Sequence, residues 1–233
     1  MKFNVSKCGV MHLGNRNMQF QYSLEGNWLN NIEQEKDLGV TINQSLKPTA
    51  HCNEMYKKAS SRLKLISRNI EYKSAEVIRK LYCAQVRPFL EYCIQFSHPY
   101  LIHDIDQLEK VQKRATKLIP SLKHLNYKDR LEQLNMFSLK KRRLRGDMIE
   151  VYKIINNIDK VESSKFFIFD TNVTRGHLYK LKKTRFNSTF YQHSFSNRVV
   201  GFWNSLSTDV VTAGSLHNFK SKLDTFMASK GIW

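Results

Sequence analysis

The chain has 233 residues, of which 41% are hydrophobic and 12% aromatic, and its formal net charge is +18. This length and apolar content can bury a substantial core, which excludes a disordered tail. The charge points to a polyanionic partner, which is nucleic acid or, less favourably, an anionic membrane surface. The sequence contains no run of about 18 apolar residues and no signal-peptide-like start. We therefore expect a soluble intracellular protein, in the cytoplasm or the nucleus, with no membrane partner.

The chain contains four cysteines, which are too few for a disulfide scaffold of this size and form no CxxC pair. We interpret them as reduced residues in or near the core: Cys8, Cys52, Cys83 and Cys93. His51 beside Cys52, and His98 with His103, do not have the spacing of a zinc site. The sequence therefore predicts no metal site.

Short apolar runs in the first 45 residues predict a small β unit. Residues 10–13 and 18–24 flank a Gly-Asn-Arg-Asn cluster that is typical of a hairpin turn, and residues 25–27 offer a second turn. Residues 38–42 then predict a third strand. Because three strands are barely enough for stability, this unit needs a neighbour to pack against.

From Pro48 onward the apolar spacing becomes that of helices. Residues spaced by three or four predict a first amphipathic helix of about 20 residues: Cys52, Met55, Ala59, Leu63, Ile66 and Ile70. Lysines and arginines fall mainly between them: Lys57, Lys58, Arg62, Lys64 and Arg68. Ser74 is expected to cap a second helix, which Pro88 ends or bends. A third helix spans residues 104–119 and ends at Pro120, and Asn126 caps a short fourth one.

Residues 138–157 combine the pattern of an amphipathic helix with a cluster of positive charges. Ser138 is a candidate N-cap, and one helix face carries apolar residues: Leu144, Met148, Val151, Tyr152 and Ile155. The first two turns carry five cations, although a helix N-terminus disfavours positive charge: Lys140, Lys141, Arg142, Arg143 and Arg145. Two interpretations stay open, a solvated basic face and a contact with a polyanion.

The helical region as a whole is expected to form a bundle over residues 48–157. Its core would include Leu63, Ile66, Leu81, Leu108, Val111, Leu118, Met148 and Tyr152. After Asp159 aromatic and basic residues alternate without a long helical period, up to about residue 200. Such a segment suits bases stacked on rings with cations along phosphates, and it also suits an irregular core flanked by lysines, which we favour for most rings. Ser215 then starts a last helix.

Six segments together carry a resemblance to a known family. They are MKFNVSKCGVMHLG, EKDLGVTIN, VRPFLEYCIQFSHPY, LEKVQKRATKLIP, FSLKKRRLRGDMIEVYKII and FSNRVVGFWNSLSTDVV. In this order they resemble the C-terminal part of reverse transcriptases from LINE-type, jockey-like non-LTR retrotransposons, and the match covers nearly the whole chain. No single segment is diagnostic of the family, but six segments in the right order are strong evidence for the resemblance.

The resemblance implies an RNA-directed DNA polymerase family in which a YxDD-type block holds two Mg²⁺ ions. That block would lie upstream of the point where this chain begins, so we expect a truncated fragment with no catalytic residue, no cofactor and no polymerase activity alone. Glu33, Glu35 and Asp37 are expected to have a surface role instead. They precede a segment that resembles the primer grip: Leu38, Gly39 and Val40.

The resemblance also implies a domain organisation and partners. Residues 1–47 would be a palm remnant, residues 48–159 a thumb-like helical domain, and residues 160–233 a C-terminal extension. The fold class is therefore expected to be α+β, mainly α, with a small antiparallel β unit first. The missing palm and fingers of a full-length reverse transcriptase would be one partner.

A second partner would be the backbone of RNA, DNA or an RNA–DNA hybrid, held by basic helices of the thumb. The expected contacts are Lys113, Arg114, Lys117, Lys140, Lys141, Arg142, Arg143 and Arg145. The alternative is a transposon relic that has no binding activity.

Overall fold

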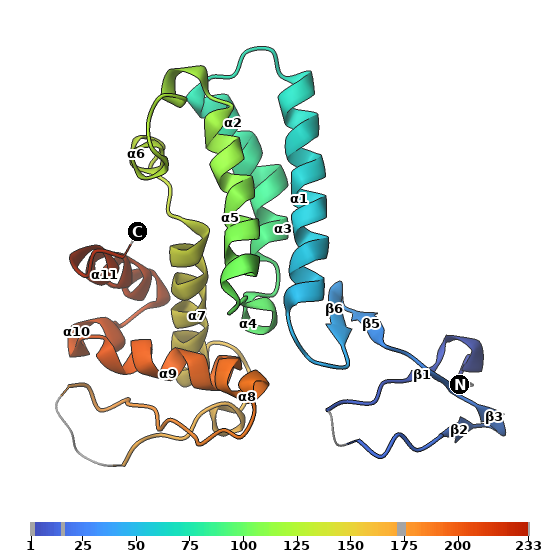
Figure 1. The fold of residues 1–233 in the computed structure, drawn as a ribbon. Helices are drawn as coiled ribbons and strands as arrows, with labels where there is room; N and C mark the ends of the chain where they lie inside the picture. The colour runs from blue at the N-terminus through green and yellow to red at the C-terminus, as the bar shows by residue number, and fades with distance from the viewer. Residues whose placement is uncertain (1–2, 15–16, 172–175, 233) are drawn as a thin grey trace.

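In the computed structural model, which describes residues 3–14, 17–171 and 176–232, helices form the body and short strands lie at the N-terminal end (Figure 1). The expected α+β, mainly α fold is confirmed. The strands are β1 (Gly9–Val10), β2 (Ser23–Leu24), β3 (Asn27–Trp28), β4 (Asn30–Asn31), β5 (Gln34–Asp37) and β6 (Val40–Asn43). The longer helices are α1 (Thr49–Asn69), α5 (Ile102–Lys117), α7 (Leu139–Ile155), α9 (Phe195–Ser205) and α11 (Leu216–Ser229). The shorter ones are α2 (Ala75–Leu81), α3 (Arg87–Glu91), α4 (Ile94–Ser97), α6 (Tyr127–Gln133), α8 (Thr189–His193) and α10 (Thr208–Val211).

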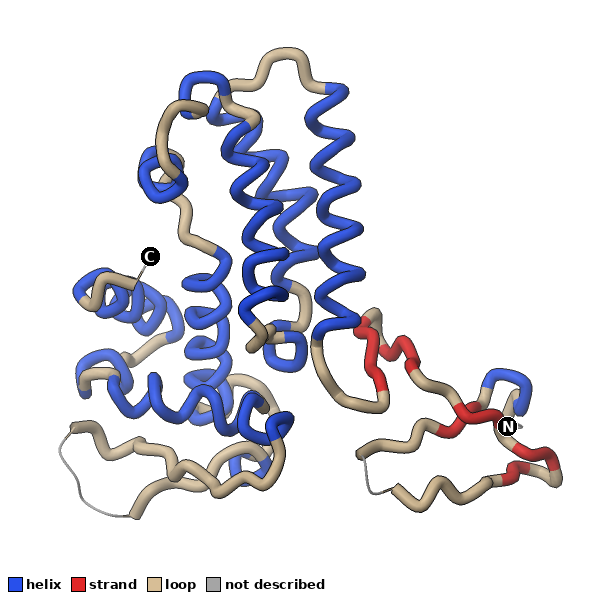
Figure 2. The backbone as a smooth tube through the Cα atoms, viewed as in Figure 1, coloured by secondary structure: helices blue, strands red, loops and turns tan. Residues whose placement is uncertain are grey.

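The N-terminal strands are confined to one end of the molecule and form three separate pairs (Figure 2). The turn at residues 25–27 joins β2 to β3 as expected. The hairpin expected between residues 10–13 and 18–24 is wrong, because β1 pairs in parallel with β4 instead. Two of the four residues expected to turn that hairpin, Asn15 and Arg16, lie outside the described residues. Several side chains of the unit are exposed, among them Phe3 at 70%, Met18 at 76% and Trp28 at 70%.

The β5–β6 hairpin connects this unit to the helices. Leu38 and Gly39 have φ of +45° and +81° and form its two-residue turn, so the expected strand starts only at Val40. The Tyr92 hydroxyl donates to the Leu38 carbonyl at 2.6 Å, and the Thr41 amide donates to His51 Nδ1 at 3.2 Å. The hairpin therefore lies against α1 and the segment after α3.

The first core lies among α1, α2, α3 and α5, and the helix caps predicted from Ser74 and Asn126 are confirmed. Pro88 does not end the second helix. Instead a π turn, η2 (Tyr82–Val86), leads into α3, and the Arg87 amide donates to the Tyr82 carbonyl. The buried residues of the first core are Cys52, Met55, Ala59, Leu63, Ile66, Ile78, Tyr82, Val86, Leu90, Leu108, Val111, Ala115, Ile119, Leu122, Leu134 and Leu139. Leu81 and Leu118 pack at its edge rather than inside it.

A second core lies between α7 and the C-terminal helices. Met148 and Tyr152 belong to this core and not, as expected, to the first one, because α7 turns its first residue, Leu139, to one core and its later turns to the other. Tyr152 stacks on Phe219 of α11 with ring centroids 4.2 Å apart. The last helix, α11, starts after Ser215 as expected, and the Ser215 side chain caps it.

The irregular segment before α9 is held by polar contacts to that helix. The Asn204 side chain accepts from the Leu181 amide at 2.9 Å and donates to its carbonyl at 2.8 Å. Trp203 Nε1 donates to the Tyr179 carbonyl at 2.8 Å. Of the eight Phe and Tyr rings described between residues 160 and 200, Phe167 and Phe195 are buried and the others are 37% to 44% exposed. The expectation that most of these rings form an irregular core is therefore wrong.

Candidate nucleic-acid interface

A carboxylate lies at the N-terminus of α7, where the cations crowd. Ser138 caps the helix by accepting from the Lys141 amide at 3.2 Å. The buried Glu109 side chain, from α5, accepts from the Leu139 amide at 3.2 Å, from the Lys140 amide at 3.3 Å and from the Tyr127 hydroxyl. Burial and the nearby Glu109 raise the pKa of Tyr127. An internal anion thus complements the positive end of this helix.

Two arginines of α7 form bidentate, partly buried ion pairs with carboxylates of other helices. Both Arg142 and Arg145 donate through two nitrogens, Arg142 to Glu91 and Arg145 to Asp224. The Arg145 contacts measure 2.5 and 2.9 Å. These pairs join α7 to α3 and to α11, and they use the planar guanidinium in the geometry that suits a carboxylate.

Two further cations of α7 are buried. Lys141 is 2% exposed and lies 3.9 Å from the centre of the Phe137 ring. Arg143 is 2% exposed, donates to the Leu90 carbonyl at 3.3 Å, and has its pKa lowered by burial. Lys140 is the one residue of the five that is exposed. The expectation that all five lie on an exposed phosphate-contacting face is therefore corrected, because the first two turns of α7 lie between the two cores.

A largely buried ion pair that the sequence analysis missed lies beside the first residues of α4. Arg198 donates to both carboxylate oxygens of Asp147, at 3.0 and 2.8 Å, and also to the carbonyls of Ile94, Gln95 and His193. Asp147 and Arg198 are 51 residues apart, so no local spacing marks them as partners. Their contacts join α7, α9 and the first residues of α4.

The three cations predicted on α5 stay outside the core, but they point to different sides. Arg114 donates to the Tyr56 hydroxyl of α1 at 3.2 Å, and this contact lowers the pKa of Tyr56. Lys113 lies over the Tyr127 ring of α6, 5.4 Å from its centre. Lys117 is exposed. Arg114 and Lys117 therefore face the α1 side or solvent, and Lys113 faces α6.

Helix α1 supplies further cations, which extend the basic surface of α5. α1 and α5 lie side by side and run in the same direction (Figure 1), as the bond between Thr49 Oγ1 and Asp104 at their starts also shows. On α1, Lys57, Lys64 and Arg68 are spaced by seven and four residues, which places them on one side of the helix, next to Tyr56. The α1–α5 face consists of Lys57, Lys64 and Arg68 from α1 and Lys110, Arg114 and Lys117 from α5, all of them exposed.

Three of the four carboxylates on these two helices are buried or neutralised. Glu54 binds Lys36 and Lys58, and hydrogen bonds from Lys36, Lys58 and Thr41 lower its pKa to about 2. Asp104 and Glu109 are buried, whereas Asp106 is exposed and lies one helical turn before Lys110. Within the described residues, no carboxylate lies within 4.0 Å of any of the six cations. The face is therefore open to an anionic ligand.

The primer-grip-like residues lie away from the α1–α5 face, in the β5–β6 hairpin. Leu38 is 84% exposed in the turn and Val40 is buried. Glu33, Glu35 and Asp37 are exposed, as expected. In the described ranges, no group of three His, Cys, Asp or Glu side chains is arranged to hold a metal ion. Nor does any described helix combine the length and the apolar character needed to cross a membrane.

No protein-family model matches the chain, and no curated protein or solved structure is significantly similar to it. The function is therefore argued from the geometry above and from the resemblance of the sequence segments.

Proposed function

We propose that this protein binds nucleic acid through the phosphate backbone, and that it does so on the α1–α5 face. The observation that carries the proposal is the set of six exposed cations on two parallel helices, none with a carboxylate partner among the described residues. From Lys57 to Arg68 the stripe on α1 is about 16 Å long at 1.5 Å per residue. Duplex nucleic acid carries about one charge per 1.7 Å of axis, so a duplex segment of this length has roughly nine phosphates on its two strands together, of which one side can contact the face.

The resemblance to the thumb region of a non-LTR reverse transcriptase supports the same proposal. It implies a role in holding a template–primer duplex of RNA and DNA, with chemistry supplied by a palm domain that carries Mg²⁺. An intracellular location, in the cytoplasm or nucleus, belongs to the same proposal. Lys113 and Lys140, which are also among the contacts expected from the sequence, remain candidates for phosphate contacts beside the α1–α5 face.

One structural alternative explains part of the basic face without a ligand. Arg114 and Lys117 lie in the last turn of α5, and Arg68 in the last turn of α1, where cations interact favourably with the helix dipole. A relic that binds nothing would retain these cations for stability alone. The exposed apolar side chains of the N-terminal unit favour this alternative, because they suit a remnant without its packing partner.

The test is the salt dependence of binding to a fluorescently labelled 20-base-pair RNA–DNA hybrid. If six cations neutralise six phosphates, the slope of log K against log salt is about −5, by the rule of roughly −0.9 per phosphate. The affinity then falls about 1,000-fold between 50 and 200 mM salt. Absence of binding at 50 mM salt by the folded protein contradicts the proposal and supports the relic.

A further inference from the structure

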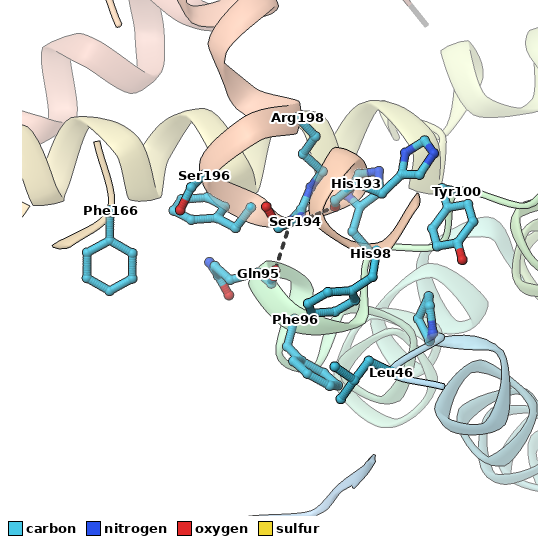
Figure 3. Close-up of a pocket in the computed structure, with 13 residues that line it drawn as sticks. Leu46, Gln95, Phe96, His98, Tyr100, Phe166, His193, Ser194, Ser196 and Arg198 are labelled. Atoms are coloured by element: carbon cyan, nitrogen blue, oxygen red, sulfur yellow. Dashed lines mark hydrogen bonds between the residues drawn. The ribbon is translucent and has the colours of Figure 1, made fainter. Parts of the chain in front are cut away.

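An aromatic pocket lies at the junction of four distant parts of the chain (Figure 3). Its volume is about 330 Å³, at the lower end of the roughly 300–1,000 Å³ range of small-molecule sites. Its lining comes from α4 and the residues that follow it, from α8 and α9, from the loop before α1, and from Phe166 in the segment between α7 and α8. The pocket is separate from the α1–α5 face, although Pro48, directly before α1, lines it.

The rings that line the pocket remain partly exposed. Phe96, Phe166 and Phe190 are 36%, 37% and 39% exposed, and Phe195 forms a buried part of the wall. Single exposed rings are ordinary on a protein surface, but several that converge on one hollow mark a binding site. In Figure 3 Phe166 and Tyr100 lie at opposite ends of the pocket, with Phe96 between them.

Two sets of contacts join the walls of the pocket. The Arg198 guanidinium donates to Asp147 and to three carbonyls, so it holds α4 against α8 and α9. The Tyr100 ring stacks on His193, with centroids 4.1 Å apart and planes at 2°. These contacts fix part of the wall before a ligand binds, which reduces the entropic cost of binding.

Polar side chains on the wall supply both donors and acceptors. Gln95 and Ser196 line the pocket. Among the described residues, neither the side-chain amide of Gln95 nor the hydroxyl of Ser196 has a hydrogen-bond partner. An amide pairs with the edge of a nucleobase because it offers one acceptor and two donors. A purely apolar ligand would leave these groups unpaired, which disfavours it.

A second, wider hollow adjoins the pocket and shares Leu46, Tyr100 and Phe190 with it. Its volume is about 760 Å³, and its lining includes Lys47, Asn187 and Ser188. A cation and hydrogen-bonding side chains beside stacking rings are the surroundings that a sugar–phosphate backbone needs. The two hollows together thus suit a nucleotide strand rather than a lone ring.

We propose that this pocket receives an unpaired nucleobase of single-stranded RNA or DNA, stacked against the rings of Phe96, Phe166 and Phe190. The inference extends the proposed function, because it adds a site for single strands to a face that contacts phosphates. A base entering the pocket contributes affinity that depends on the ring and not on the charge of the strand.

The experiment compares a twelve-nucleotide oligothymidylate with an abasic strand of the same length and charge, by fluorescence anisotropy. Stacking of one base is expected to make the thymidylate bind roughly 5- to 150-fold more tightly than the abasic strand. Equal affinities of the two strands for the wild-type protein would overturn the inference while the proposed phosphate binding stands.

Two neighbouring residues of α8 give a matched pair of variants. Phe190 lines the pocket and Tyr191 does not, although their exposures are 39% and 42%. Phe190→Ala should lower the affinity for thymidylate to the abasic level and leave abasic binding unchanged, whereas Tyr191→Ala should change neither. Phe96→Ala is a second pocket variant, and circular dichroism confirms that each variant is folded.

A separate measurement applies if neither strand binds, in which case the proposed function fails. Saturation-transfer NMR with adenosine monophosphate then tests the pocket alone. Transfer to the base protons that Phe190→Ala abolishes and Tyr191→Ala retains supports the inference. No transfer to the base protons overturns it, and the pocket then takes another aromatic group, such as a side chain of a protein partner.

Discussion

At the scale of single residues, the cations of α7 serve the fold. Arg142 and Arg145 are each paired with a carboxylate, and Arg143 is buried, so truncation should affect stability more than binding. The sequence shows the cations but not their partners, because Glu91 and Asp224 lie 51 and 79 residues away. A local excess of charge therefore cannot distinguish a ligand site from internal ion pairs.

Arg142→Ala is the direct check of this assignment. It leaves Glu91 half-buried without its main partner, which should cost roughly 1–3 kcal/mol, between the values of exposed and buried pairs. Urea denaturation measures the loss, and the salt slope of hybrid binding should stay unchanged. If the variant is as stable as the wild type and the salt slope of its hybrid binding is reduced, Arg142 contacts nucleic acid and this assignment is wrong.

Glu109 is the second residue whose role the structure defines. Glu109→Ala removes the acceptor of two amides of α7 and of the Tyr127 hydroxyl, and should cost at least about 2 kcal/mol. Glu109→Gln retains an acceptor oxygen and should cost less. Equal stability of Glu109→Ala and wild type in urea would show that water replaces the carboxylate.

Acid should weaken the docking of the β5–β6 hairpin through His51. Burial lowers the pKa of His51 from its usual 6.5, against the attraction of Glu54, while Lys58 and Lys36 lower it further. Below pH 6.5 the unfolded chain binds a proton that the folded chain does not. The stability is therefore complete above about pH 6.5 and declines at lower pH, by at most about 1.4 kcal/mol per pH unit for this group.

The measurement is the unfolding free energy in urea between pH 7.5 and 5. Burial also lowers the pKa of His177 and His193, so the wild type should lose stability through all three. His51→Gln should make the decline shallower. A decline that His51→Gln leaves unchanged would contradict the role of His51.

At the scale of elements, the long helices between residues 48 and 157 and the last helix were predictable, whereas α9 and the strand pairing were not. Side-chain caps at Ser74, Asn126 and Ser138 are local signals, and all three are confirmed. The partner of β1 is β4, whose two residues are both asparagine and carry no apolar alternation. Pairing of such short strands depends on tertiary contacts that no local pattern encodes.

The first core depends on α5, which the spacing of its apolar residues predicted. Leu108 is 3% exposed in this core, so Leu108→Ala should cost about 2–5 kcal/mol. Leu65→Ala, on the outer side of α1 at 46% exposure, is the control and should stay within about 0.5 kcal/mol. Similar effects of the two variants on thermal unfolding would contradict the packing of α5 against α1.

At the scale of the whole molecule, α7 connects two cores that a reading by residue ranges would place in separate units. Leu139 belongs to the first core, and Met148, Val151 and Tyr152 belong to the second. The proposed domain limit near residue 159 stays a prediction. The basic residues outside these cores gather on α1 as well as on α5.

Matched double variants test whether the α1–α5 face binds nucleic-acid phosphates, because the salt slope of binding reports the number of phosphates that the protein neutralises. Lys110→Gln with Lys117→Gln removes two charges from the face, while Lys220→Gln with Lys222→Gln removes two from α11. The first pair should make the slope of log K against log salt about two units shallower, and the second should leave it unchanged. Equal slopes for the two folded double variants would contradict the account.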